Sequence, residues 1–197
     1  MTTLYDEKWG QGPRTCGGCT LCCRLLPVHH DGDMPGGWHK AAGERCRHQR
    51  TGKGCAVYRK AGFPTACVYW NCRWLTGIDT AELRRPDRAH YVLDVVPDYV
   101  TLSADDLTPT KIEVVQVWCD PKYPDAHKDP ALRAYLARRG EEGVAALIRY
   151  SSGDAFFLCP PAMSSDGQWH ERHDGQVEPD RTPEEMVAGV AEARGQT

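Results

Sequence analysis

Cysteine crowding is the feature that most constrains this chain: eight of its ten cysteines lie between Cys16 and Cys72. The segment 27–45 (PVHHDGDMPGGWHKAAGER) is rich in turn-forming residues, so a regular ladder of hydrogen bonds cannot hold it. The N-terminal sequence MTTLYDEKWG lacks the basic start and apolar run of a secretory signal. We therefore expect a cytoplasmic, bacterial-type protein whose thiols bind metal instead of forming disulfides.

The charge of the chain is unevenly distributed. Residues 1–75 hold eleven Lys and Arg against five Asp and Glu, whereas the remainder holds thirteen against twenty-two. A basic half is compatible with nucleic-acid binding, but the chain as a whole has a pI of about 6.2 and its arginines lie beside cysteines instead of forming a stripe. We expect these cations to offset the negative charge of metal-bound thiolates. No apolar stretch is long enough to cross a membrane.

The spacing of the first four cysteines (CGGCTLCC) leaves two kinds of metal centre open. Three cysteines separated by two residues each are typical of three corners of a [4Fe–4S] cluster. Structural zinc more often takes two cysteines from one knuckle and two from another. Cys22 and Cys23 are neighbours, so either they serve two centres, or one is a ligand while the other packs.

The candidate metal ligands are therefore all eight cysteines of this region, with one histidine as a further candidate: Cys16, Cys19, Cys22, Cys23, Cys46, Cys55, Cys67, Cys72 and His48. His48 follows Cys46 by two residues, a spacing that can place an imidazole on or beside a metal. An ordinary histidine in a basic loop explains it equally well. Trp70 and Trp74, on either side of Cys72, are expected to shield the centre from water.

The same residues resemble the bacterial CxxCxxCC (YkgJ-type) family, whose members are described as zinc- or iron-chelating proteins. The resemblance covers residues 16–75 and includes, beyond the eight cysteines, these positions: Lys40, Ala42, Gly43, His48, Gly54, Tyr58 and Trp74. The chain departs from the family pattern at Gln49, where a cysteine is often found, at residues 62–65, and at Trp70. The resemblance implies metal binding, and it implies no particular activity.

After Trp74 the sequence changes to a pattern of ordinary secondary structure. We expect, in order, strands at 90–100 and 111–118, a helix that Asp129 caps and Gly140 ends, a hairpin at 144–150 and 155–158, and a helix at 182–193. The expected fold class is α+β: an irregular metal-stapled N-terminal module with short helices, then a small antiparallel sheet in the order ββαββ, and a C-terminal helix.

We divide the chain into a cysteine-cluster module (residues 1–75) and a small α+β body (residues 76–197), packed together as one compact unit. The function expected first is metal binding, with zinc or an iron–sulfur cluster in a structural or sensing role. An iron–sulfur enzyme or electron-transfer protein is the alternative, and a nucleic-acid-binding zinc module is the weaker third. Besides a metal ion or cluster, we expect no membrane partner and disfavour nucleic acid as a partner, and the sequence leaves protein partners open.

Overall fold

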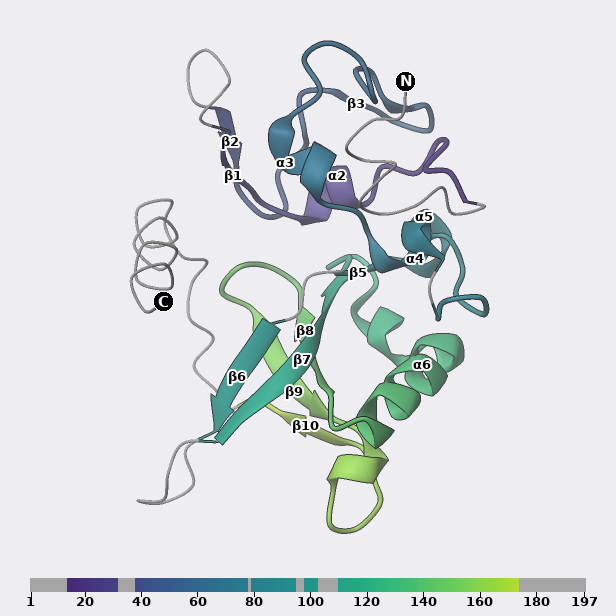
Figure 1. Ribbon diagram of the computed structural model, residues 1–197, viewed down its shortest axis with the longest axis vertical. Helices are drawn as coiled ribbons and strands as arrows, with labels where there is room; N and C mark the ends of the chain where they lie inside the picture. The colour runs from purple at the N-terminus through teal and green to yellow at the C-terminus, as the bar shows by residue number, and fades with distance from the viewer. Residues whose placement is uncertain (1–13, 32–37, 78, 95–97, 103–109, 174–197) are drawn as a thin grey trace, which may run out of the picture.

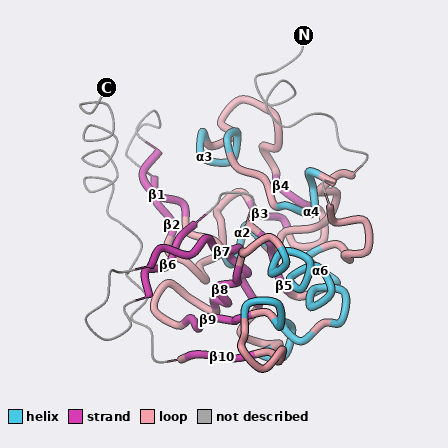
Figure 2. Tube along the Cα trace, turned by 60° about the horizontal axis from the view of Figure 1, so that its bottom comes forward, coloured by secondary structure: helices cyan, strands magenta, loops and turns pink. Residues whose placement is uncertain are grey.

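The computed structural model describes residues 14–31, 38–77, 79–94, 98–102 and 110–173. These residues form two parts, with the cysteine module lying over one end of a β-sheet that helix α6 covers on its side (Figure 1). In the module, loops and turns predominate over helices and strands (Figure 2). The expected α+β class is therefore correct in outline.

The module is built from very short elements, as its sequence predicts. Two of them are strand pairs, β1 with β2 and β3 with β4, and both pairs are antiparallel. The described elements of the module are α2 (Cys22–Leu25), β1 (Val28–Asp31), β2 (Trp38–Lys40), β3 (Gln49–Arg50), β4 (Gly54–Cys55), α3 (Thr65–Tyr69) and α4 (Arg73–Thr76).

The body contains a six-stranded sheet in the order β10-β9-β8-β7-β5, with β6 also pairing with β7. Strand β7 is the longest described strand and the one on which the sheet is organised, because β5, β6 and β8 all pair with it. The described elements of the body are α5 (Pro86–Ala89), β5 (Tyr91–Leu93), β6 (Asp98–Leu102), β7 (Thr110–Cys119), η1 (Pro124–Lys128), α6 (Pro130–Glu141), β8 (Ala145–Arg149), β9 (Ala155–Cys159), η2 (Pro161–Met163) and β10 (His170–Arg172).

The expectation of a small antiparallel sheet is wrong, because the sheet is mixed. Strands β7 and β8 run parallel, with Val114 opposite Ala145. The reason is α6, which follows β7 and returns the chain to the end of the sheet where β7 began, so β8 enters in the same direction. The single strand expected at 90–100 is also two strands, β5 and β6, which pair with successive parts of β7. Strand β10 was not expected.

Helix α6 begins as the sequence predicts and ends differently. The Asp129 side chain accepts hydrogen bonds from the amides of Ala131 and Leu132, at 2.9 and 3.3 Å. Gly140 does not end the helix, which continues to Glu141. A Cβ at Gly140 would lie 2.5 Å from the Cβ of Pro160, so this glycine is needed for close packing against the residue before η2.

The expected apolar face of α6 is confirmed. Its buried residues pack on one face of the sheet, in the main hydrophobic core of the described residues. That core also contains Cys119, which is 1% exposed and serves as a small buried side chain. The helix residues concerned are Leu132, Tyr135 and Leu136.

Two further expectations concern a C-terminal helix and membrane-spanning segments. The C-terminal helix expected at 182–193 lies outside the described residues. In the parts of the chain that the structure does describe, no helix combines the length and the apolar character that crossing a bilayer requires.

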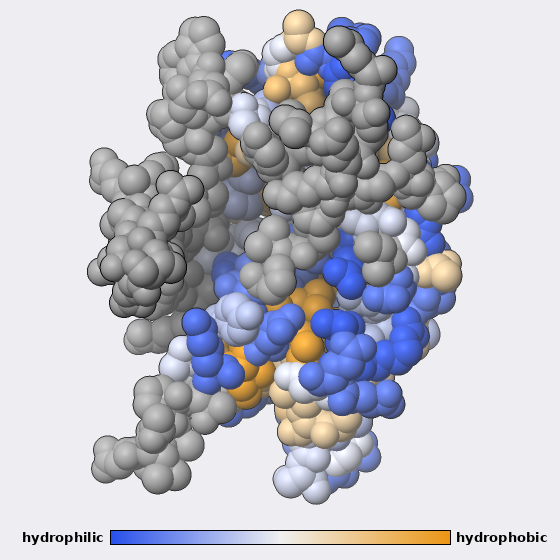
Figure 3. Space-filling view, in the orientation of Figure 1, coloured by the Kyte–Doolittle hydropathy of each residue, from blue (hydrophilic) through white to orange (hydrophobic). Residues whose placement is uncertain are grey.

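The cysteine module and the sheet share a second hydrophobic cluster. From the sheet, Val92 on β5 and Trp118 on β7 contribute side chains that are 0% and 3% exposed. From the module come Leu21, Leu25, Leu26, Cys72 and Leu75. On the face seen in Figure 3 the described surface is mostly hydrophilic, and the described hydrophobic residues that show there gather mainly over the sheet, below the module. The module therefore depends on the sheet for part of its interior.

Polar contacts fix the same junction. Arg24 on α2 forms an ion pair with Asp120, which directly follows β7 and has a side chain that is 5% exposed. The indole nitrogen of Trp70 donates a hydrogen bond of 2.7 Å to Asp94 Oδ1, just after β5. The first contact ties α2, which begins with Cys22 and Cys23, to the end of β7, and the second ties the end of α3 to the end of β5.

Substituting Asp120→Asn removes the charge that faces Arg24 and keeps the side-chain shape. We expect the free energy of unfolding to fall by about 1.5–3 kcal/mol, the range for hydrogen bonds to charged groups. Urea denaturation measures this value. The matched control is Glu82→Gln, which breaks the more exposed Arg138–Glu82 pair and is expected to cost about 0.2–1 kcal/mol. Equal losses in the two variants would contradict a special role for Arg24–Asp120.

Candidate metal centre

The first two cysteines lie on a tight turn. The amide of Cys19 donates a hydrogen bond of 2.8 Å to the carbonyl of Cys16, which closes the turn. Gly17 within it has φ +50°, a left-handed conformation that glycine adopts without steric cost. The backbone of the turn between the two cysteines thus favours glycine at position 17.

The backbone of this turn lies directly against the β3–β4 hairpin. A Cβ at Gly18 would lie 2.5 Å from the carbonyl oxygen of Gly52. A Cβ at Gly54 would lie 2.3 Å from the carbonyl oxygen of Gly17. Contacts this close leave no room for a side chain, so glycines in both segments allow the hairpin that carries Cys55 to approach Cys16.

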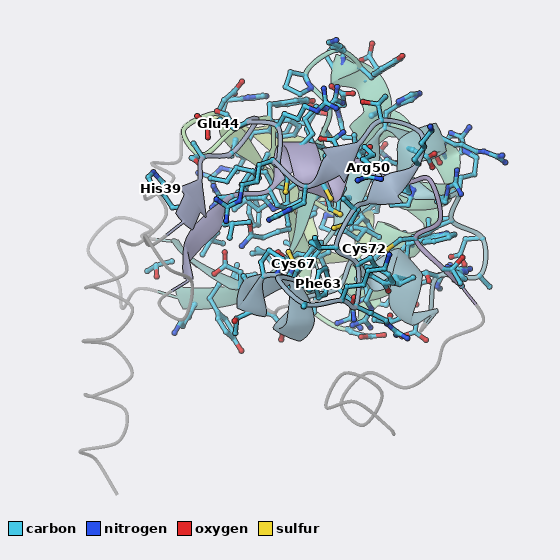
Figure 4. All side chains as sticks on the ribbon, turned by 90° about the horizontal axis from the view of Figure 1, so that it is seen from above. His39, Glu44, Arg50, Phe63, Cys67 and Cys72 are labelled. Carbon is cyan, nitrogen blue, oxygen red and sulfur yellow. The ribbon has the colours of Figure 1, made fainter. Side chains whose placement is uncertain are left out.

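The remaining cysteines come from three short elements and one loop. Cys22 and Cys23 begin α2, Cys67 lies on α3, and Cys72 directly precedes α4. The amide of Cys46 donates a hydrogen bond of 3.0 Å to the carbonyl of Cys23, which holds the loop against α2. Sulfur atoms gather near the middle of Figure 4, with Cys67 and Cys72 labelled.

Four of these sulfurs accept hydrogen bonds from backbone amides. Each of the four has a donor two or three residues farther along the chain, as where the amide of His48 lies 3.4 Å from Cys46 Sγ, and Cys19 has a distant donor as well. Such bonds favour a thiolate over a thiol and are typical of the surroundings of metal-bound cysteine. The pairs are Leu21 and Asp87 to Cys19, His48 and Gln49 to Cys46, Val57 and Tyr58 to Cys55, and Leu75 to Cys72.

Burial and crowding have the opposite effect on the thiols. Burial first, and then the charges of neighbouring cysteines, raise the pKa of Cys16 and of Cys72 to about 12. The pKa of Cys22 is raised by its hydrogen bond to Cys23, and the same bond lowers the pKa of Cys23. Seven cysteines are linked by pairwise electrostatic interactions, each with at least one other of the set: Cys16, Cys19, Cys22, Cys23, Cys46, Cys55 and Cys72.

Cations face the same sulfurs. The Lys40 side chain is buried, and its Nζ donates to the carbonyls of Ala41 and Glu44 at 3.1 and 3.0 Å. Its charge acts to lower the pKa of the thiols of Cys23 and Cys46. Arg59 acts in the same direction on Cys16, and Arg85 on Cys19. The arrangement agrees with the expectation that basic residues offset negative charge on sulfur.

The sulfurs nevertheless do not form a complete metal-binding site. Among the described residues, no three Cys, His, Asp or Glu side chains form a group that is ready to hold a metal ion. Cys22 and Cys23 are hydrogen-bonded to each other instead of both facing a common centre. The donor set fits zinc or an iron–sulfur cluster by its chemistry, and the side chains must turn inward to bind either.

The structure gives His48 and Cys67 less support as metal ligands than it gives the other candidates. The ring Nε2 of His48 accepts a hydrogen bond of 3.2 Å from Arg47 Nε, and burial lowers its pKa, which favours neutral imidazole. Its amide donates a hydrogen bond of 3.4 Å to Cys46 Sγ. Cys67 is half-buried on α3. Metal ligation by all nine candidates stays a prediction.

Both tryptophans expected to shield the centre pack against the shared hydrophobic cluster. Sequence reasoning missed the residues that complete this cluster from the sheet, Val92 and Trp118, because no local signal in a β-strand reveals its partner. It also missed Arg24 as the link to Asp120. Gln49, noted only as a departure from a family pattern, has a buried Oε1 without a hydrogen-bond partner among the described residues.

Comparison with known proteins adds no relative. No family model matches the chain, and neither do the curated proteins or the solved structures. The resemblance of residues 16–75 to the CxxCxxCC family therefore stays a prediction.

Gly54→Ala tests the close approach of the two backbones. The substitution adds left-handed strain of about 1–2 kcal/mol and an overlap with Gly17 that costs about 1–3 kcal/mol more. We expect the hairpin to move and zinc affinity to fall, as measured by competition with a chromogenic chelator. Gly62→Ala is the matched control, because Gly62 has φ +80° against +87° at Gly54 but open space around its Cβ position. An equal effect of both variants would show that strain alone matters.

Stability of the metal-free and metal-loaded protein should depend on pH with opposite signs. Without metal, thiols whose pKa is raised from 9.0 to about 12 stay protonated in the folded state while the unfolded chain ionises. Stability therefore falls as the pH rises above 9. With zinc, folding releases thiol protons, so stability rises with pH below 9. Chemical denaturation in a reducing buffer, at several pH values with and without zinc, checks both slopes. Slopes of the same sign would contradict the prediction.

Proposed function

We propose that this chain is a metal-binding protein whose cysteine module holds zinc or an iron–sulfur cluster in a structural or sensing role. The observation that carries the proposal is the set of amide–sulfur hydrogen bonds at Cys19, Cys46, Cys55 and Cys72. Turns that direct amides at sulfur prepare a thiolate, and a buried thiolate requires a cation beside it.

The short elements of the module point in the same direction. A helix of four residues, such as α2, is too short to be stable by itself. Metal–thiolate bonds would tie these elements together and contribute directly to folding. The CxxCxxCC resemblance is part of the proposal, because the matching positions include Lys40 as well as the eight cysteines. Lys40, Arg59 and Arg85 would hold the charge of the site in balance without being ligands.

Purification without oxygen, followed by metal analysis and a visible spectrum, tests the proposal. Zinc in a colourless protein indicates a thiolate-bound zinc site. Iron with acid-labile sulfide in a brown protein indicates a cluster and favours the enzyme or electron-transfer alternative. Protein that is folded and contains neither metal, and that takes up neither zinc nor iron on reconstitution, would rule out the proposed function.

A further inference from the structure

The crowded cysteines divide into two groups that meet at α2. The first group belongs to the hydrophobic cluster shared with the sheet. Cys72 is 6% exposed in that cluster, and three half-buried cysteines pack against it: Cys16, Cys19 and Cys22. Two of the three lie on the Cys16–Cys19 turn, and the third is the first residue of α2.

The second group is held together by backbone hydrogen bonds. Cys46 donates its amide to the carbonyl of Cys23, at 3.0 Å. Its own carbonyl accepts from the amide of Gln49, also at 3.0 Å, and Gln49 lies opposite Cys55 in the β3–β4 pair. Cys55 is within electrostatic reach of both Cys23 and Cys46, and Cys16 of the first group also reaches Cys23 and Cys55, so the two groups adjoin. Among the described residues, Cys23, Cys46 and Cys55 do not belong to the shared hydrophobic cluster.

The two groups have different surroundings. The first lies against Val92 and Trp118 of the sheet, and Arg59 and Arg85 face Cys16 and Cys19 electrostatically. The second lies beside Lys40, whose Nζ is 3.4 Å from the carbonyl of Arg24 and whose charge faces Cys46, Cys23 and also Cys22. Four thiolates around one Zn²⁺ leave two negative charges, which Arg59 and Arg85 can offset. Three thiolates leave one negative charge, which Lys40 can offset.

We propose that the module binds two metal ions, one through Cys16, Cys19, Cys22 and Cys72, and the other through Cys23, Cys46 and Cys55. The proposal rests on the proposed function and extends it. The two centres adjoin, because the Cys22 and Cys23 thiols hydrogen-bond to each other. Four thiolates complete a tetrahedral site, whereas three leave one position for a further ligand.

Metal stoichiometry tests the number of centres. The full-length metal-free protein is titrated anaerobically with Zn²⁺, and separately with ¹¹³Cd²⁺ for NMR. We expect two equivalents of bound metal and two cadmium resonances, with the one from four thiolates shifted farther downfield. One equivalent with one resonance would overturn the two-centre proposal and leave the proposed function intact. No binding of either ion would also overturn the two-centre proposal, and together with no uptake of iron on reconstitution it would overturn the proposed function as well.

Two substitutions test the division of the ligands. Cys46→Ser should remove the second equivalent and its resonance while the first resonance remains. Cys19→Ser should do the reverse. Cys159→Ser is the matched control, since Cys159 ends β9 in the body, and it should keep both ions. If Cys19→Ser fails to fold, Cys46→Ser decides alone. Loss of both resonances in folded Cys46→Ser protein would show a single merged cluster and overturn the proposal.

Discussion

A buried thiol must either keep its proton or face a cation, and the cysteine module is arranged around that constraint. Its sulfurs are drawn together by turns and hairpins whose backbones touch at Gly18 and Gly54. The same crowding raises the pKa of the thiols, while amide hydrogens and the buried Lys40 act against it. For the crowded thiols to lose their protons, positive charge must enter the cluster. Metal binding, as we propose it, supplies that charge.

Much of the site could be predicted from the sequence, because its signals are local. Two-residue spacing between cysteines and the Gly17–Gly18 pair point to a knuckle, and the structure contains such a turn. The N-cap at Asp129 and the hairpin after residue 144 are local signals as well, and both are present. Local hydrogen bonding decides these features, so a short window of sequence contains the information that fixes them.

What could not be predicted depends on contacts between distant segments. The sequence from 90 to 118 indicates two strands but not that α6 makes β8 parallel to β7. The role of Gly140 depends on Pro160, and the inner surface of the module depends on Val92 and Trp118. The sequence predicts a helix end at Gly140 because glycine is common at helix ends, whereas the close approach of Pro160 is what requires a glycine there. The periodicity of a strand shows which of its faces is apolar, but it does not show which segment of the chain packs on that face.

The hydrophobic cluster shared by module and sheet has a consequence for how the chain is assembled. The cysteines are synthesised early, yet Trp118 emerges from the ribosome more than forty residues after Cys72. Until then the underside of the module has no apolar surface to rest on, and eight reactive thiols are exposed to oxidants and to adventitious ions. The module can therefore complete its interior only after strand β7 has been synthesised. Until then the cysteines of the nascent chain need a reducing environment to stay as free thiols.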